Sequence, residues 1–261
     1  MHGFRGVGPS TDLVLHAGLV AGVEVRDVEL IRNGSNALYR VAGGAVARVG
    51  RPGRLDQAAK EVEVSRWLRT QGVSAVEAVA GIHQLVMVDR RPVTFWVELP
   101  QHRAATPAEL GAVLRALHAA PRPSGEGLPE LDPLARCAET VETARFLTLA
   151  ERRFLRERLA DLSQRWQELP PELPPSVVHG DAWQGNAAVS GSRAPVLLDL
   201  EAVSVGPPEW DLVPLAADAV RFKGIERQDY RTFVAAYGHD VTDWAGFDTF
   251  ADLCELRGLS S

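Results

Sequence analysis

The most informative segment of this 261-residue chain is His179-Gly180-Asp181-Ala182-Trp183-Gln184-Gly185-Asn186. A further acid, Asp199, follows the apolar run Val196-Leu197-Leu198. Magnesium-dependent phosphoryl transfer uses one carboxylate to face the attacking hydroxyl, and an amide and a second carboxylate to hold the metal on the phosphates. These residue types at this spacing therefore indicate a Mg²⁺-dependent transfer of phosphate to a hydroxyl.

The flanking sequence fixes where these side chains emerge. Asp181 follows a short apolar strand expected at 177–178, and the chain returns to a strand at 187–189. We expect Asp181 to orient the acceptor hydroxyl or take its proton, and Asn186 and Asp199 to bind Mg²⁺, which prefers oxygen ligands. A lone His-Gly-Asp is a weak signal, because a turn without chemistry explains it equally well. The three positions together are much more specific.

Composition and charge exclude several other classes of protein. The net charge of −6 argues against nucleic acid or an acidic membrane surface as the main partner. No apolar run has the length of a membrane span, and the first residues lack the apolar run of a secretory signal, so we expect a cytoplasmic protein. Cys137 and Cys254 have no motif spacing, and we expect reduced thiols.

The first hundred residues predict a small antiparallel sheet with few helices. We expect helices over 11–20 and 55–70, and strands over 23–31, 37–41, 45–49, 84–88 and 93–99. The turn Asn33-Gly34-Ser35-Asn36 lies between two of these strands. Glu98-Leu99-Pro100 ends the last strand and is expected to lead into a second lobe.

After residue 100 the pattern is mainly helical. We expect helices over 107–119, 209–222, 226–237 and 242–256, and one or two helices over 134–169. The exception is 177–200, where a short strand, the motif loop and a hairpin turning at 190–192 are expected. The fold class is therefore α+β, with lobes at 1–99 and 100–261.

The chain resembles the aminoglycoside phosphotransferase family of small-molecule kinases. The resemblance rests on the motif segment 179–186, on Leu198-Asp199-Leu200-Glu201 and on Gly206-Pro207-Pro208-Glu209-Trp210-Asp211-Leu212. Residues 61–68 and 110–118 also resemble family helices, so the likeness runs from about Ile31 to about Leu256. It implies a bilobal protein-kinase-like fold, a nucleotide-binding lobe at 1–99 and a catalytic and substrate-binding lobe at 100–261.

Carried over position by position, the resemblance makes Asp181 the catalytic base and Asn186 and Asp199 the Mg²⁺ ligands. It makes Arg48 the phosphate-binding cation, where a protein kinase has lysine, and Glu61 its acidic partner. Spacing to the end of the helix favours Glu61 over its neighbour Glu63. Without the resemblance, both glutamates are explained as part of a solvent-exposed helix face.

The resemblance also implies nucleotide contacts in the first lobe. Ser35 is expected in a phosphate-covering turn, although a plain hairpin turn explains it as well, and the backbone from Glu98 to Pro100 is expected to bind the purine edge. These residues leave ATP and GTP as equal candidates for the phosphoryl donor.

Three other residues of the motif region have two interpretations each. His179 is expected to brace the loop rather than to move protons. Asp211 either braces the same loop or is a first-turn carboxylate that favours the helix dipole. Trp183 either packs under the loop or lines the acceptor pocket, where it would face a cationic substrate.

The acceptor is expected to be a hydroxyl-bearing small molecule, such as an aminoglycoside-type antibiotic or another cationic or sugar-like compound. The acids of 224–261 favour a cationic acceptor slightly, although a solvated helix surface explains them more simply. The oligomeric state is left open. The alternatives are a nucleotide-binding module without turnover, and a metal phosphohydrolase built on His179, Asp181, Asp199 and Glu201. A protein kinase is disfavoured, because only residues 200–205 separate Asp199 from Gly206. This leaves no obvious activation segment.

Overall fold

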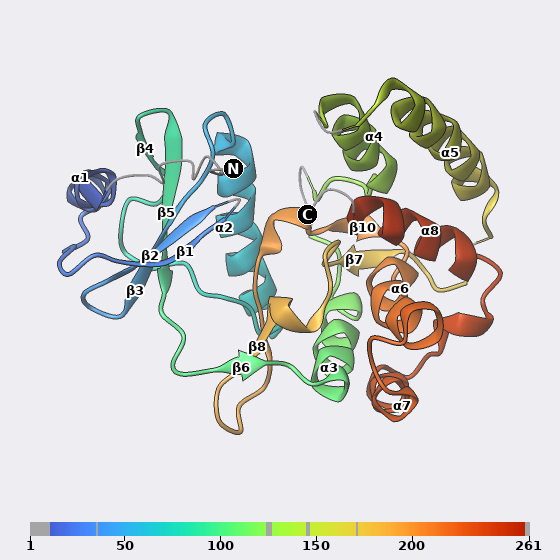
Figure 1. Ribbon diagram of the computed structural model, residues 1–261. Helices are drawn as coiled ribbons and strands as arrows, with labels where there is room; N and C mark the ends of the chain where they lie inside the picture. Colours follow the sequence, from blue (N-terminus) through green and yellow to red (C-terminus); the bar gives the residue numbers. More distant parts are fainter. Residues whose placement is uncertain (1–10, 35, 124–126, 145–146, 171, 259–261) are drawn as a thin grey trace. The chain divides into compact units, whose positions relative to one another are not determined.

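The antiparallel sheet is present in the computed structural model, which describes residues 11–34, 36–123, 127–144, 147–170 and 172–258 (Figure 1). Its strands are β1 (Glu29–Asn33), β2 (Ala37–Val41), β3 (Ala45–Val49), β4 (Val86–Val88) and β5 (Arg91–Val97). They hydrogen-bond in the order β1-β2-β3-β5-β4, and each neighbouring pair is antiparallel. This confirms the fold class expected for the first part of the chain.

The two faces of this sheet pack against different helices. Successive side chains of a strand alternate between these faces. On one face Ala47 and Phe95 join a buried cluster with residues of α1 (Thr11–Ala21). On the other face Trp96 packs against Val62 of α2 (Leu55–Thr70). The helices α1 and α2 lie on opposite sides of the sheet (Figure 1). The alternation therefore puts Arg48 of β3 on the face toward α2.

Three strand starts differ from the sequence prediction. The strand expected over 93–99 begins at Arg91 and ends at Val97. The strand expected over 23–31 begins only at Glu29, because Asp27 has a left-handed backbone (φ 47°) that interrupts the extended run. The strand expected over 84–88 begins at Val86, because Leu85 is also left-handed (φ 70°). The side chain of Gln84 there hydrogen-bonds the Phe95 backbone N–H and C=O, in place of a strand backbone.

The second part of the chain is mainly helical, as expected. Its helices are α3 (Pro107–His118), α4 (Pro133–Thr143), α5 (Leu149–Glu168), α6 (Glu209–Ala217), η3 (Asp218–Phe222), α7 (Arg227–Tyr237), η4 (Val241–Asp243) and α8 (Phe247–Gly258). The segment 134–169 forms separate helices, because Thr148 caps the start of α5 and accepts a hydrogen bond from Glu151 N–H. The helix expected from residue 242 begins at Phe247, after Trp244 adopts an extended backbone.

Short strands hold the motif loop. They are β6 (Arg103–Ala104), β7 (Ser176–Val178), β8 (Ala187–Val189), β9 (Val196–Leu197) and β10 (Ser204–Gly206). The strands β7 and β10 pair antiparallel, and β8 and β9 are neighbours in a sheet with β6, as the predicted hairpin requires. The loop 179–186 thus leaves one strand and enters another, ending in the short helix η1 (Gln184–Asn186).

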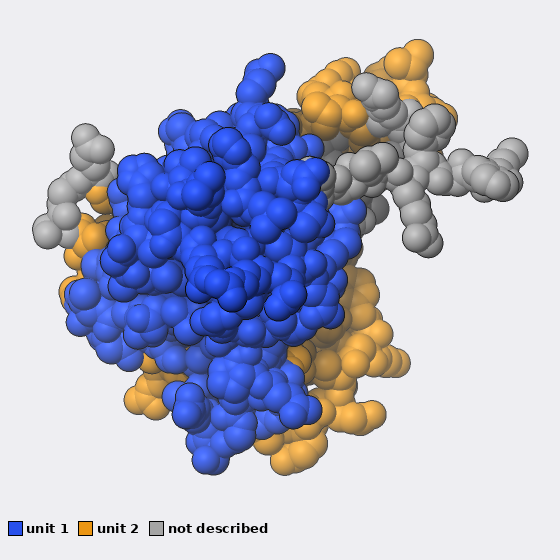
Figure 2. Space-filling model, turned by 90° about the vertical axis from the view of Figure 1, so that its left-hand side faces the viewer, with its two compact units in different colours: residues 1–103, 188–201 blue, residues 104–187, 202–261 orange. Residues whose placement is uncertain are grey.

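The described residues fall into two compact units, coloured separately in Figure 2. Unit 1 comprises 1–103 and 188–201, and unit 2 comprises 104–187 and 202–261. The segment that contains Asp199 therefore belongs with the sheet. The predicted functional division at residue 99 stays a prediction, because compactness does not measure binding or catalysis. No helix in the described ranges combines the length and apolar character needed to cross a membrane.

Candidate functional site

Unit 1 gathers three acids around Arg48. The guanidinium forms an ion pair with Glu61 of α2, and its Nη2 lies 3.3 Å from Asp199 Oδ1 and 3.2 Å from Glu201 Oε2. Glu61 is only 3% exposed, whereas Glu63 on the same helix is exposed. The pairing expected between Arg48 and Glu61, rather than Glu63, is present.

Burial and charge act against each other in this cluster. Burial raises the pKa of Glu61 to about 7, and Arg48 only partly opposes that shift. Burial also works against the charge of Arg48, but Glu61, Asp199 and Glu201 together outweigh burial and raise the arginine's pKa. One guanidinium faces three carboxyl groups, so the cluster attracts cations.

Asp199 has an uncommon backbone conformation. Its φ is 52°, in the left-handed region that residues other than glycine seldom adopt. It follows β9, whose Leu197 hydrogen-bonds the backbone at Ser74 and Val76, and it precedes the short helix η2 (Leu200–Ala202). Such conformations cost about 1–3 kcal/mol and persist where the surroundings hold them. The fold thus holds this carboxylate at a fixed point.

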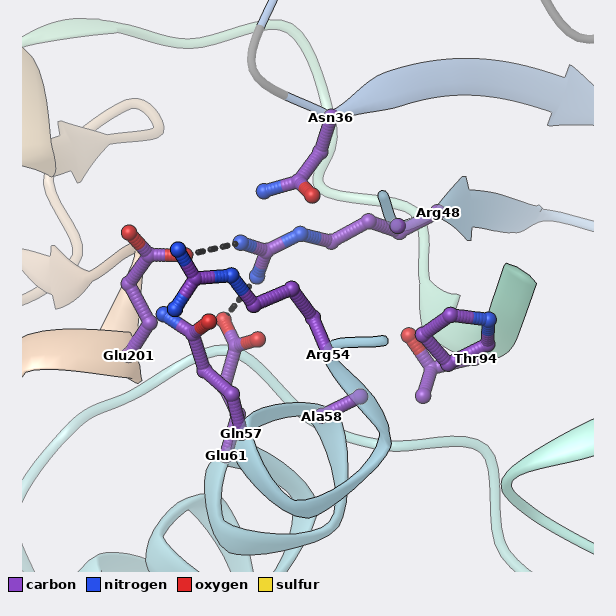
Figure 3. Close-up of a pocket in the computed structure, with 10 residues that line it drawn as sticks. Asn36, Arg48, Arg54, Gln57, Ala58, Glu61, Thr94 and Glu201 are labelled. Carbon is purple, nitrogen blue, oxygen red and sulfur yellow. Dashed lines mark hydrogen bonds and ion pairs between the residues drawn. The ribbon is translucent and has the colours of Figure 1, made fainter. Parts of the chain in front are cut away.

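A pocket opens over the Arg48 cluster (Figure 3). It is lined by Asn36, Arg48, Gly50, Arg54, Gln57, Ala58, Glu61, Pro92, Thr94 and Glu201. Figure 3 shows the Arg48 side chain crossing from β3 toward Glu201, with Glu61 rising from α2. With its amide oxygen turned to the guanidinium, Asn36 accepts from Arg48 Nε at 3.1 Å. The pocket lining therefore includes the cations Arg48 and Arg54 as well as the acids Glu61 and Glu201.

The expected purine-binding backbone follows β5. Glu98 N–H already donates to Gly44 O (2.8 Å), and Pro100 has no N–H. These two residues can therefore offer a purine only carbonyl oxygens, while Leu99 between them carries an N–H. The Glu98 side chain pairs with Arg40 (2.6 Å). Ser35, the expected phosphate contact, lies outside the described residues.

Unit 2 holds the motif loop by its backbone. Asp211, in the first turn of α6, accepts hydrogen bonds from His179 N–H (2.5 Å) and Gly180 N–H (2.9 Å). Asp211 also lies 3.0 Å from His118 Nε2, and His118 Nδ1 lies 2.8 Å from the Tyr237 hydroxyl. Burial opposes charge on Asp211, but His118 and the His179 N–H outweigh it and lower its pKa. Asp211 is therefore a loop brace, and His179, fully buried, has a structural place.

The loop brings Asp181 and Asn186 together. Asn186 Nδ2 donates to Asp181 O (2.9 Å) and Asp181 Oδ2 (3.2 Å). The Asp181 side chain is 40% exposed, so its carboxylate remains accessible. Because the Asn186 nitrogen is used toward Asp181, its oxygen is the atom left to act as a metal ligand.

Two glycines permit this loop shape. Gly180 has φ 79°, and a Cβ there would lie 2.4 Å from Ala202 O. A Cβ on Gly185 would lie 2.1 Å from the indole of Trp183. Trp183 thus covers Gly185, yet it is 55% exposed. A ring packed beneath the loop would be mostly covered. The exposure of Trp183 therefore does not support that one of its two interpretations.

Sequence reasoning missed several contributors. Sequence analysis quoted Glu201 within the motif but gave it no role in a kinase. Its carboxylate nevertheless forms an ion pair with Arg48. Arg257 of α8 contacts Asp181 and was not assigned, because residues 76 positions apart give no local pattern. The sequence placed His118 at the end of a segment that resembles a helix of the family. It did not predict the contact of His118 with Asp211.

Three of the seven acids in 224–261 form ion pairs with arginines. Arg221 of η3 contacts Asp248, Asp252 and Glu255 at 2.5–2.9 Å. Arg158 and Arg165 of α5 also bind Asp252. Asp240 accepts from the Tyr230 hydroxyl. The ion pairs of Asp248, Asp252 and Glu255 weaken the support that this segment gave to a cationic acceptor.

A sequence profile of the phosphotransferase enzyme family, APH, matches residues 27–250. No curated protein sequence matches the chain. The matched range includes every residue assigned above to the Arg48 cluster and to the motif loop except Arg257.

Solved structures share the fold. Aminoglycoside phosphotransferase APH(3'')-Id from Streptomyces rimosus is 19% identical, with a TM-score of 0.68, and the match covers 94% of this chain and 96% of that one. The amicoumacin kinase hAmiN, solved with AMP-PNP, Ca²⁺ and Ami, is 15% identical with a TM-score of 0.71 over 95% and 84%. Choline kinase LicA from Streptococcus pneumoniae is 16% identical with a TM-score of 0.67 over 94% and 86%. At these identities the likeness shows the fold.

Proposed function

The chain belongs to the phosphotransferase enzyme family, and we propose that it transfers the γ-phosphoryl group of ATP or GTP to a hydroxyl of a small molecule, with Mg²⁺. Family membership makes it a small-molecule kinase, and the donor, the metal, the acceptor and the residue roles are the parts we propose. The observation that carries the proposal is the fixed pair of Asp181 and Asn186 on a loop braced by Asp211.

Asp181 is proposed to face the acceptor hydroxyl. In phosphoryl transfer the transition state is loose, and catalysis consists mostly of positioning and charge neutralisation. A carboxylate that accepts the hydroxyl's hydrogen bond orients its oxygen and takes its proton as the new P–O bond forms. The 40% exposure of Asp181 leaves room for that contact.

Asn186 and Asp199 are proposed to hold Mg²⁺. Both offer side-chain oxygen, the donor type that this cation prefers, and Asp199 lies in a cluster where carboxyl groups outnumber the guanidinium. When bound, the metal neutralises negative charge on the phosphates. The residues present therefore suit a hard divalent cation.

Arg48 is proposed to bind the donor phosphates, and Glu61 to hold Arg48 in place. A guanidinium presents a planar fork to phosphate oxygens. We propose purine contacts along Glu98, Leu99 and Pro100, with Leu99 supplying the N–H that its neighbours cannot, and Ser35 as a phosphate contact. The hAmiN structure was solved with AMP-PNP, which supports a nucleotide donor for this fold.

The acceptor is proposed to be a hydroxylated small molecule, with aminoglycoside-type antibiotics, macrolides, amino sugars and amino alcohols tested first. Structures of this fold include an aminoglycoside phosphotransferase and a choline kinase. The paired state of Asp248, Asp252 and Glu255 gives no preference for cationic compounds. Neutral sugars therefore belong in the same screen.

The test is a nucleotide-consumption screen over these acceptors with ATP or GTP and Mg²⁺, followed by mass spectrometry of the product. With the best acceptor, we expect Asp181→Asn to lower kcat at least about 100-fold. The matched control is Asp161→Asn, an exposed aspartate of α5, which should leave kcat unchanged.

Other outcomes identify the alternatives. Nucleotide binding without Mg²⁺-dependent turnover of any acceptor favours a binding module. Release of free phosphate from many esters, with His179 required as a metal ligand, favours a phosphohydrolase. Equal kcat for Asp181→Asn and the wild type contradicts the role proposed for Asp181.

A further inference from the structure

Arg257, near the end of α8, contacts the motif loop at two points. Its Nη1 donates to Gly180 O (2.6 Å), and its Nη2 lies 2.9 Å from Asp181 Oδ1. The Arg257 side chain is 22% exposed. One guanidinium therefore joins a loop carbonyl and the adjacent loop carboxylate.

The guanidinium is itself held by its surroundings. Its central carbon lies 5.5 Å from the centre of the buried Trp210 ring. Trp210 Nε1 donates to the same Gly180 carbonyl, at 3.1 Å. Arginine stacks on aromatic faces and forms rigid forked hydrogen bonds, so the ring and the carbonyl together define where the fork points.

We propose that Arg257 is a positioning residue that fixes the Asp181 carboxylate for the acceptor hydroxyl; this rests on the function proposed above for Asp181. Arg257 takes Oδ1, and Asn186 Nδ2 donates to Oδ2 at 3.2 Å. With one contact on each oxygen, rotation of the carboxylate about its side-chain torsions is restricted. Each oxygen keeps lone-pair capacity for a further donor.

Fixing the carboxylate suits this reaction. A misplacement of 1 Å in a catalytic group costs on the order of 100-fold in rate. In a loose transition state the acceptor's orientation matters more than the strength of the base. A cation on Asp181 therefore helps catalysis as long as it holds the carboxylate without covering it, which the 40% exposure of Asp181 allows.

The experiment compares Arg257→Gln, Arg257→Lys and Arg257→Gly with Arg221→Gln. Arg221 also binds α8, through Asp248, Asp252 and Glu255, and none of these partners lies in the motif loop, so Arg221→Gln controls for loosening of the helix. For Arg257→Gln we expect kcat to fall on the order of 100-fold, with the nucleotide KM within about twofold of wild type.

Two readouts separate positioning from general stability. Lysine retains a donor for Asp181, so Arg257→Lys should recover about tenfold of the lost kcat. Guanidinium ion added to Arg257→Gly should raise kcat several-fold, and it should do nothing for Arg221→Gln. A loss in Arg257→Gln no larger than in Arg221→Gln, or one that appears only as a lower Tm, overturns the proposal.

The crystal structure of Arg257→Gln gives a test that does not need an acceptor. We expect the Asp181 carboxylate to leave its wild-type rotamer, and an unchanged rotamer overturns the proposal. The Asp181→Asn variant distinguishes a failure of the proposed function from a failure of the role proposed for Arg257. If it retains full turnover, the proposed function fails at Asp181. If it abolishes turnover while Arg257→Gln does not, the fault lies with the role of Arg257 alone.

Discussion

At the scale of single residues, Arg48 is the side chain on which most of the unit 1 cluster depends. Its guanidinium is 13% exposed and pairs with Glu61, Asp199 and Glu201. Removing one member of a buried ion pair is far more costly than removing an exposed charge, because the remaining groups stay buried without compensation. The neighbouring Arg54 is exposed, which makes it a matched comparison in the same pocket.

We therefore expect Arg48→Met to lower the free energy of unfolding by about 3 kcal/mol and Arg54→Met by less than about 0.5 kcal/mol. Arg48→Lys should keep the charge but lose the fork, and raise the nucleotide KM roughly tenfold. Thermal unfolding and steady-state kinetics with varied nucleotide measure both effects. Equal Tm losses for the two methionine variants would contradict the central place of Arg48.

Asp211 gives a prediction about pH. Its hydrogen bonds from His118 and the loop N–H groups lower its pKa below the ordinary 3.8. A carboxyl whose folded pKa is depressed stabilises the fold fully above its unfolded pKa, and that contribution disappears as pH falls through the folded value. The stability difference between wild type and Asp211→Asn should thus be largest near pH 7 and shrink below about pH 4.

Urea unfolding of both proteins from pH 7 to pH 3 measures this difference. We expect about 3 kcal/mol at pH 7, because the buried N–H donors lose a charged acceptor. Asp161→Asn, on the exposed face of α5, should show a small and constant difference across the same range. A difference for Asp211→Asn that grows on acidification would be inconsistent with a depressed pKa.

At the scale of elements, the motif loop depends on the close approach of Gly180 to the chain at Ala202. A Cβ at Gly180 would meet Ala202 O at 2.4 Å, in addition to the cost of φ 79°. Gly191 has a similar φ of 59°, but no heavy atom lies within 4 Å of a Cβ built there. The two glycines therefore separate backbone strain from steric conflict.

We expect Gly191→Ala to cost about 1 kcal/mol through backbone conformation alone. Gly180→Ala should cost at least twice as much and should also lower kcat, since the loop that carries Asp181 must shift. Thermal unfolding and turnover with the best acceptor measure the two variants. Similar Tm values for both would mean that the Gly180 contact relaxes without consequence.

The elements also show what sequence patterns can predict. The bounds of α2 follow from its apolar spacing and from the lack of a breaker before Gly72, and the prediction over 55–70 is confirmed. The late start of β1 was unpredictable, because nothing in the local pattern requires a left-handed Asp27. The strand β10 was missed, because it exists through its pairing with β7, a long-range contact that no local pattern records.

The candidate site divides in the same way. Motif spacing identified Asp181 and Asn186 because they share one short loop, and the structure brings those two together. The contact of Arg257 with that loop depends on how α8 packs, which no sequence spacing records. The sequence therefore identified the residues of the motif loop. It did not identify Arg257, whose contact with that loop arises from tertiary packing.

At the scale of the whole molecule, the cysteines report on how tightly α8 is packed. Cys137 and Cys254 both carry thiols rather than a disulfide in the structure. Burial raises the pKa of Cys254 to about 12, and Cys137 is 2% exposed. A thiol reacts as its thiolate, so burial suppresses reaction both by access and by protonation.

We expect native protein at pH 8 to react with a disulfide reagent far more slowly than protein unfolded in guanidinium, in which both thiols should react at once. The residual native rate should rise in Arg221→Gln, because that change loosens the ion pairs of α8. Rapid labelling of one thiol in the native wild type would contradict the burial of Cys137 or the raised pKa of Cys254.

Trp183 gives the enzyme an optical signal of its own. Its indole is 55% exposed, whereas Trp96, Trp210 and Trp244 are at most 9% exposed. An aqueous quencher such as acrylamide therefore reaches Trp183 before those three rings. Because Trp183 lies on the same short loop as Asp181, an acceptor that settles there should shield it and shift its emission to the blue. The affinity for an acceptor is then measurable by fluorescence titration, without turnover, dye or tag.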